Sequence, residues 1–436
     1  EFRIGMWIGG AASPNRLLAG ENQETPSAEG NLRRLRNNLP EKGSGTVLQF
    51  ELCPWCGDES DTGVKNPINW GITELNGQKS LLGICPIETC LFHKGIPFTC
   101  VDDDLYLNPP SILLGTADKF AQLSRNPIPK SVYGRGTPQA RQYNARTMLG
   151  FDDRHYAPDL IIQDELHLLT GPLGTIAGLI ETAMDVSWDS VGHQPKYVAA
   201  TATIRGAERD AMLMYGKELN VFPPPVATAS DNFFAQMDSN EENGRKHVAI
   251  MGPPGVSRTM FAQPTGSLIQ RLHELRVKNP SIPDNVFDPY FTLVGYFNSL
   301  RELGGAQTML ADRVAREFIA GRYAQTGAVT PREISNLKEL TSRRTAAELK
   351  SVKASLAREI GDEPVDAVVT TNMFQVGIDI SRLGLMVITG QPKSNSEYIQ
   401  SSGRVGRRHP GLVVSLLRGT YPRDLSHFEN FREFHQ

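Results

Sequence analysis

The sequence predicts an α/β protein with two domains, each built on a mainly parallel β-sheet. Short apolar runs flanked by Gly, Pro or polar residues alternate with longer segments in two separate blocks. This alternation is typical of parallel strands that helices cover on both faces. Prolines and clusters of Asp, Glu, Asn and Gly at residues 222–246 separate the two blocks. We therefore expect a first domain at residues 1–235, a linker at residues 236–246 and a second domain at residues 247–436.

The composition fits a globular protein of two or three domains. With 436 residues, 39% of them hydrophobic and 21% charged, the chain is not of the disordered class. Its formal net charge of −3 indicates no general affinity for nucleic acid, so any basic surface must be local. No apolar run is long enough to cross a bilayer, and the first residues are not a signal peptide. We expect a cytoplasmic protein without membrane contact and, because the chain does not begin with Met, a piece of a longer protein.

The two blocks place the expected elements along the chain. Residues 1–50 show no sustained periodicity, and residues 50–104 hold all five Cys. In the first block, strands are expected at residues 111–116, 160–163 and 197–202. In the second block, helices are expected near residues 299–323 and 331–360, and strands at residues 247–251, 291–297, 365–371, 385–389 and 412–417.

Four of the Cys form two short pairs, Cys53 with Cys56 and Cys85 with Cys90. Without a secretion signal, such pairs favour a metal site in a reducing compartment over disulfides. Two thiolates from each pair can hold one tetrahedral Zn²⁺, so we expect a zinc-binding insertion at about residues 50–104. The alternative is a small core that contains reduced cysteines. Cys100 lies in a strand-like run and is expected to be a buried small hydrophobe.

Two acids follow the strand expected at residues 160–163. Parallel sheets bind ligands at the carboxyl ends of their strands, where Asp164 would hold Mg²⁺ and Glu165 would activate a water molecule. The alternative is a strand end with solvated acids, beside which His167 only packs or forms hydrogen bonds. Thr201 and Thr203 follow the next strand, where their hydroxyls can bond to these acids or simply begin a turn.

The second block carries two polar segments. In the first, Gly377 permits an unusual backbone turn, and Asp379 is suited to accept a hydrogen bond from a ribose hydroxyl or an arginine. In the second, Arg404 and Arg407 lie on a turn poor in side chains, which suits a grip on a triphosphate across a cleft. The alternative for this arginine turn, residues 403–407, is a solvated basic loop.

Four motifs in one order resemble superfamily 2 helicases of the DExH type. They are Asp-Glu-x-His at residues 164–167, Thr-Ala-Thr at 201–203, the run 372–379 and Gln-x-x-Gly-Arg-x-Gly-Arg at 400–407. The resemblance implies two RecA-like domains that bind ATP and Mg²⁺, with catalytic roles for Asp164, Glu165, Arg404 and Arg407. It implies nucleotide contacts by His167, Gly377, Asp379, Gln400 and Gly403, with Gly377 and Asp379 coupling the nucleotide to domain closure. It also implies a coupling role for Thr201 and Thr203. Nucleic-acid contacts are expected from Thr116, Lys119, Arg343, Thr371 and Asn372.

Several longer sequence segments make the resemblance more specific. The chain resembles the large helicase-related protein family of DISARM-type bacterial phage defence at residues 109–111, 115–121, 164–174, 340–343 and 390–393. This resemblance covers nearly the whole chain and implies a prokaryotic DNA-associated ATPase. Its expected partners are DNA, single-stranded or duplex with a single-stranded end, and a subunit of the same defence system.

One motif of such an ATPase is missing from the sequence. The phosphate-binding pattern G-x-x-x-x-G-K-[ST] is absent, and the nearest run, residues 252–259, has Ser257 and Arg258 in place of Gly and Lys. We expect the loop to precede residue 1, so that the first domain is incomplete and this fragment alone does not hydrolyse ATP. The alternatives are a non-hydrolysing DNA-binding scaffold of helicase fold and an RNA helicase.

Overall fold

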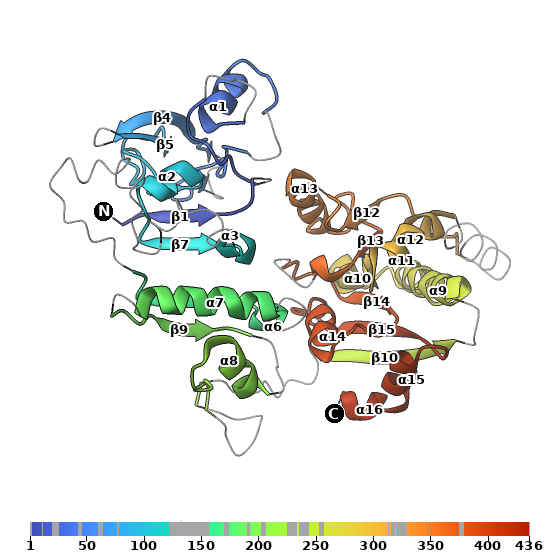
Figure 1. Cartoon of the computed structure of the whole chain (residues 1–436). Coiled ribbons are helices and arrows are strands. Elements are labelled where there is room, and N and C mark those ends of the chain that lie inside the picture. Colours follow the sequence, from blue (N-terminus) through green and yellow to red (C-terminus); the bar gives the residue numbers. More distant parts are fainter. Residues whose placement is uncertain are drawn as a thin grey trace. The chain divides into compact units, whose positions relative to one another are not determined.

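A computed structural model shows how the chain folds (Figure 1). It describes residues 2–10, 12–19, 26–41, 46–59, 64–75, 78–121, 132, 157–169, 174–189, 192–201, 206–224, 233–234, 244–252, 257–312, 314, 319, 329–344, 346–374 and 379–435. The chain divides into two compact units, Glu1–Asn220 and Val221–Gln436. The expected division into domains and a linker stays a prediction, although β10 (Arg245–Gly252) begins inside the expected linker.

The first unit contains two small parallel sheets. In one, β1 (Ile4–Trp7) pairs with both β6 (Phe98–Thr99) and β7 (Ile112–Gly115). In the other, β8 (Leu160–Gln163) pairs with β9 (Lys196–Ala199). Strand β1 lies in a stretch where we expected no regular element, because four residues with alternating burial are too few for a recognisable period.

One core joins the two sheets of the first unit. Trp7 and Leu105 are buried together with Met184 and Trp188 of α7 (Gly174–Asp189), and alternate residues of β7, β8 and β9 pack against this cluster. The intervening residues of the same strands are exposed on the other face: Ile112, Leu114, Leu160, Ile162 and Val198. The remaining helices of the unit are α1 (Ala28–Arg36), α2 (Asp102–Leu107), α3 (Ala117–Ala121), α6 (Leu166–Leu169) and α8 (Ala207–Tyr215).

The Cys-rich insertion is built on an antiparallel hairpin of β4 (Asn69–Leu75) and β5 (Gln78–Ile84). A shorter pair, β2 (Asp58–Glu59) with β3 (Val64–Lys65), lies next to the first Cys pair in the chain. Cys53 and Cys85 belong to a core that also contains Trp70 and Leu81 and receives Ile4 and Met6 of β1. The insertion therefore shares its core with the parallel sheet.

The second unit contains a six-stranded, all-parallel sheet in the order β10-β15-β14-β11-β13-β12. Its strands alternate side chains between two cores. Leu293 and Val387 enter one core, whereas their neighbours Val294 and Met386 enter the other. The strands are β11 (Leu293–Phe297), β12 (Leu337–Leu340), β13 (Ala367–Thr370), β14 (Leu385–Thr389) and β15 (Gly411–Arg418).

Helices cover the sheet of the second unit, as Figure 1 shows. They are α9 (Ser257–Lys278), α10 (Asp284–Phe291), α11 (Leu300–Gly304), α12 (Ala306–Met309), α13 (Ala346–Leu356), η5 (Asn372–Phe374) and α14 (Asn395–Ser402). Helix α15 (Pro422–Glu429) contacts β15, and α16 (Phe431–Phe434) contacts α15. This confirms the predicted α/β class, and the parallel sheet between helices is the RecA-like architecture that the resemblance implied.

One secondary-structure expectation in this unit was wrong. A helix was expected throughout residues 331–360, but β12 occupies Leu337–Leu340 and only α13 is helical. The sequence Leu-Lys-Glu-Leu of β12 is rich in helix-favouring residues. It forms a strand because it lies at the edge of the sheet beside β13, where charged residues are tolerated.

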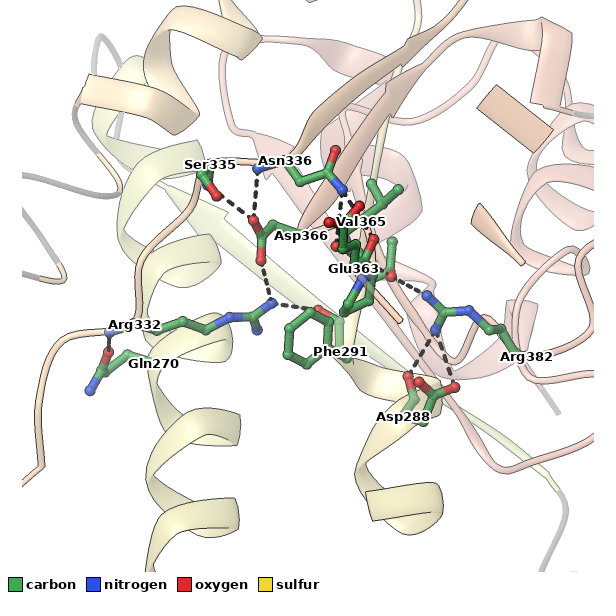
Figure 2. A network of polar contacts seen from close by, with 12 residues as sticks. Gln270, Asp288, Phe291, Arg332, Ser335, Asn336, Glu363, Val365, Asp366 and Arg382 are labelled. Carbon is green, nitrogen blue, oxygen red and sulfur yellow. Dashed lines mark hydrogen bonds and ion pairs between the residues drawn. The ribbon is translucent and has the colours of Figure 1, made fainter. Parts of the chain in front are cut away.

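Buried ion pairs connect the amino ends of the strands in this sheet (Figure 2). Arg332 lies 3.1 Å from Asp366, which also accepts hydrogen bonds from the backbone of Ser335 and Asn336. Arg382 lies 3.2 Å from Asp288, with both side chains at most 8% exposed. Because each charge has a partner and further hydrogen bonds, the network ties helix α10 and the loops before β12, β13 and β14 together.

Across the described parts of the chain, no helix has the length and apolarity that a membrane crossing requires.

Candidate nucleotide, nucleic-acid and metal sites

The carboxylate pair lies at the carboxyl ends of β8 and β9, whose ends are joined by backbone hydrogen bonds. Glu165 has a φ of +53°, a left-handed conformation that is uncommon for a residue with a side chain. Its N–H donates to Asp164 Oδ1 at 2.9 Å, which helps to hold the turn. Such backbone strain is common at functional sites, and here it occurs at the second of two consecutive acids.

His167 connects the carboxylate pair to the next strand. Its Nδ1 lies 3.4 Å from Glu165 Oε2 and 3.4 Å from Thr201 Oγ1, and its side chain is only 11% exposed. Four predicted residues, Asp164, Glu165, His167 and Thr201, are thus brought together at one edge of the sheet. Thr203 lies outside the described residues. The oxygen donors of the two acids suit Mg²⁺, which prefers carboxylate and water ligands.

A buried polar group behind this edge was not recognised in the sequence. Glu181 of α7 accepts a hydrogen bond from Gln163, the residue before the carboxylate pair, and Gln163 accepts one from Tyr215 of α8. Burial raises the pKa of Glu181 to about 7, an effect opposed by the Gln163 hydrogen bond and increased by Asp185. The three side chains fix the end of β8 between two helices. A lone Glu within a helix carries no sequence signal for this contact.

The arginine turn is held by its backbone at both sides. Gly406 has a φ of +67° and donates to Leu383 O at 2.8 Å, and Val405 between the two arginines is fully buried. A Cβ at Gly406 would lie 2.7 Å from the Cα of Gly411, so no other residue fits without a shift. Arg245 Nε, from the first strand of the unit, donates to Val405 O at 2.7 Å.

Asp379 binds an arginine in this structure. Arg407 Nη1 lies 2.6 Å from Asp379 Oδ1, and Arg407 Nε donates to Gly403 O at 3.3 Å. The sequence left two partners open for Asp379, and the described contact is with the arginine. Arg404 is half-buried on the same turn, and Gln400 lies on α14, the helix that leads into it. Gly377 lies outside the described residues, as do residues 253–256 of the run nearest to a phosphate loop.

The residues expected to contact nucleic acid lie at carboxyl ends of strands in both units. Arg343 follows β12, whereas Thr371 and Asn372 follow the adjacent β13. Asn372 and Arg343 are exposed, while Thr371 is buried and donates to Asn372 Oδ1 at 3.3 Å. Parallel neighbours end at the same edge, so these three positions form one local group.

In the first unit, the two expected nucleic-acid contacts differ in accessibility. Thr116 is exposed after β7, but Lys119 Nζ lies 2.6 Å from Asp102 Oδ2 with a side-chain exposure of 3%. Burial raises the pKa of Asp102, and the hydrogen bond and charge of Lys119 oppose that shift. Lys119 therefore neutralises a buried carboxylate in this structure and does not present its charge to solvent.

The four paired cysteines converge as a metal site requires. The sulfur atoms of Cys53, Cys56, Cys85 and Cys90 all lie within 4.8 Å of one another. The Sγ atoms of Cys53 and Cys90 are 3.7 Å apart, and those of Cys56 and Cys85 are 3.5 Å apart. A tetrahedral ion with Zn–S bonds of about 2.3 Å separates its sulfurs by about 3.8 Å, whereas a disulfide bond measures about 2.05 Å.

Cys100 does not belong to this group. It is fully buried, and burial raises the pKa of its thiol to about 12, with Asp104 and Asp102 adding to the shift. A protonated, inaccessible thiol is neither a nucleophile nor a ready metal ligand, so the prediction of a small buried hydrophobe fits its surroundings.

The chain is similar to known proteins. The helicase conserved C-terminal domain family matches residues 332–409, which include β12, β13, β14 and the arginine turn. Over its whole length, the chain is 37% identical to the DISARM protein DrmA of Bacillus paralicheniformis, and it spans 40% of that protein. The chain is related to DrmA and to the superfamily 2 helicases.

Other relatives are more distant than DrmA. The uncharacterized ATP-dependent helicase YprA of Bacillus subtilis is 23% identical over 61% of this chain and 30% of its own length. The DUF1998 helicase MrfA, whose crystal structure contains DNA, has a TM-score of 0.47 and 17% identity over 76% of this chain and 36% of that chain. The chain thus spans less than half of DrmA and of each of these relatives.

Proposed function

We propose that this chain forms part of the core of an ATP-driven DNA helicase or translocase that acts in an anti-phage defence system. The observation that carries the proposal is that each unit holds its half of the expected motif set. The acids and His167 meet at the carboxyl ends of β8 and β9, and the arginine turn is fixed beside Asp379 in the second unit. The relationship to DrmA supports the defence context, and the DNA in the MrfA structure supports the choice of nucleic acid.

Within this proposal, Asp164 would hold Mg²⁺ and Glu165 would orient and deprotonate the attacking water. Bound ATP would supply the phosphoryl group, and bound Mg²⁺ would neutralise part of its charge. Glu165 is directed by its left-handed backbone and by His167, and Thr201 extends this contact to β9. Arg404 and Arg407 stabilise negative charge on the phosphoryl group, for which Arg407 must leave Asp379.

The Cys-rich insertion supports the fold of the first unit. We assign Zn²⁺ to Cys53, Cys56, Cys85 and Cys90, because their sulfur separations agree with four ligands around one ion. Bound zinc would cross-link the insertion, whose core is continuous with β1.

A scaffold that does not hydrolyse ATP is the second candidate, and one sequence feature favours it. No phosphate-binding loop of the usual form occurs in these 436 residues. The exposed apolar face of β7, β8 and β9 supports the contrary proposal, that the first domain is completed by further chain carrying this loop.

The test is ATP turnover by the complete protein, with and without single-stranded DNA, duplex DNA and RNA. We expect DNA to stimulate turnover, and Glu165→Gln to reduce it at least about 100-fold because general-base catalysis is lost. Asp210→Asn, which changes an acid of α8 in the same unit, is the matched control. Equal turnover by Glu165→Gln and the parent protein would refute the catalytic assignment, and stimulation by RNA alone would refute the choice of DNA.

A further inference from the structure

The amino ends of β10 and β15 form a basic surface whose residues Arg245, Lys246 and Arg408 have no role in the proposed catalysis. Arg245 lies opposite Gly411 in the parallel register, so these ends are at the edge of the sheet opposite to Thr371 and Asn372. A pocket of about 500 Å³ is found here, lined among others by Arg245, Lys246, Tyr290 and Pro410. All of its lining residues belong to the second unit.

The charge of this surface is one-sided. Residues 244–246 and 404–411 contain Arg245, Lys246, Arg404, Arg407 and Arg408, and no Asp or Glu. Asp379 pairs with Arg407, whereas Lys246 and Arg408 are exposed and make no ion pair or hydrogen bond with the described part of the chain. Burial lowers the pKa of Arg245, and the positive charge of Arg407 lowers it further. Like charges are therefore held close together here, and an anion would relieve their repulsion.

The walls of the pocket are fixed by contacts that leave the charged groups available. Tyr290 of α10 donates its hydroxyl to Pro410 O at 2.8 Å, which holds the loop after Arg408 and His409 against the helix. Arg245 uses its Nε to bind Val405 O, and its stem packs against the two glycines at positions 406 and 411. A fixed concave surface with unpaired cations is suited to phosphate oxygens, which Arg and Lys bind strongly.

We propose that the pocket lined by Arg245, Lys246 and Tyr290, together with the exposed Arg408 two residues before its lining residue Pro410, binds phosphates of a nucleic-acid strand, apart from the catalytic arginine contacts. The chemistry recognised is the phosphate group, and the presence of several cations, with Arg245 and Lys246 in the pocket and Arg408 on the segment that leads into it, favours a phosphodiester backbone over a single free phosphate. This inference rests on the proposed function in one respect, namely that the protein binds nucleic acid. It adds a second contact surface on the opposite edge of the sheet.

The test measures binding of a fluorescein-labelled single-stranded DNA of 20 thymidines to the complete chain by anisotropy between 50 and 300 mM NaCl. Each neutralised phosphate of a single strand contributes a slope of about 0.7 in log K against log salt, so Lys246→Gln with Arg408→Gln should lower the slope by about 1.4. At 0.1 M salt this corresponds to a loss of affinity of about 25-fold. Lys278→Gln with Arg432→Gln removes the same charges from exposed helical positions and should leave the slope unchanged.

The outcomes separate this inference from the proposed function. An unchanged slope and affinity in the Lys246 and Arg408 variant, with normal binding by the parent chain, would overturn the pocket alone. Sodium pyrophosphate at matched ionic strength tests for a free phosphate ligand. If pyrophosphate binds the parent chain and not the variant, while DNA binding is the same in both, the pocket proposal is also overturned. Absence of DNA binding by the parent chain would overturn both. DNA-stimulated ATP turnover by the complete protein, with and without the same substitutions, then shows whether the catalytic proposal survives by itself.

Discussion

Replacing Arg382 with Met should unfold the second unit at a much lower urea concentration and leave the first unit unaffected. The Arg382 guanidinium makes an ion pair with Asp288 at 3.2 Å, and it donates to Leu356 O at 2.8 Å and Thr292 Oγ1 at 2.7 Å. Both charged side chains are at most 8% exposed. Met fills a similar volume but leaves the Asp288 carboxylate buried without its cation.

The expected loss is large because a buried charge without its partner is costly. Removing one member of a buried ion pair typically costs about 3–5 kcal/mol. With a urea slope of about 3 kcal/mol per M, the midpoint should fall by about 1–1.7 M. Arg358→Met, which removes a surface pair with Glu363 at 3.4 Å, is the matched control and should cost at most about 1 kcal/mol.

The distribution of Trp allows each unit to be followed separately. The four Trp, at positions 7, 55, 70 and 188, all lie in the first unit, so Trp fluorescence reports that unit alone. Far-ultraviolet circular dichroism reports helices of both units. Arg382→Met should shift the dichroism transition and leave the fluorescence transition in place. Equal shifts by both signals, or a shift no larger than that of Arg358→Met, would show that the buried network does not stabilise the second unit in this way.

Three further predictions follow from other parts of the structure. Replacing Cys53 and Cys56 by Ser should remove bound zinc, measured by mass spectrometry of the purified protein, whereas Cys100→Ser should retain it; retained zinc in the first variant would contradict the assignment. His427 is 2% exposed, and burial lowers its pKa to about 4, so the unfolded chain binds more protons and stability falls as the pH drops from about 6.5 towards 4. Between pH 7 and pH 5 the free energy of unfolding, measured by the dichroism transition, should fall by about 1–2 kcal/mol, and His427→Leu should lessen that fall. An unchanged pH dependence in the variant would be contrary evidence. Gly406→Ala, with φ at +67° and a Cβ contact of 2.7 Å, should lower the midpoint by more than Gly304→Ala, which meets no atom within 4 Å; similar effects of the two changes would show that the turn adapts.

Much of the second unit could be predicted from the sequence because its strands are strongly apolar and bounded by turn-forming residues. The strand expected at residues 385–389 matches β14, and Val-rich β13 lies within its expected range. Strand β12 could not be recognised, since its Lys and Glu favour a helix and only its pairing with β13 makes it a strand. Local preference fails where a tertiary contact decides the structure.

The sequence predicted where the candidate residues lie along the elements of the fold, but not the contacts that they make. The sequence order brought Asp164, Glu165 and His167 to one strand end, and the ion pair of Asp379 with Arg407 was one of two stated alternatives. The hydrogen bond from Arg245 to Val405 could not be foreseen, because it depends on β10 and β15 being neighbours. Burial of Lys119 against Asp102 likewise depends on packing between distant segments.

The position of β10 in the sheet also has a consequence for synthesis of the protein. This first strand of the second unit has a single strand neighbour in the described sheet, β15, and its Arg245 lies opposite Gly411. Ribosomes add about 5–20 residues per second, so β10 leaves the ribosome roughly 10–30 s before its partner exists. During that interval an apolar strand edge is open to incorrect pairing. The last step in folding this sheet must therefore follow translation of almost the entire unit.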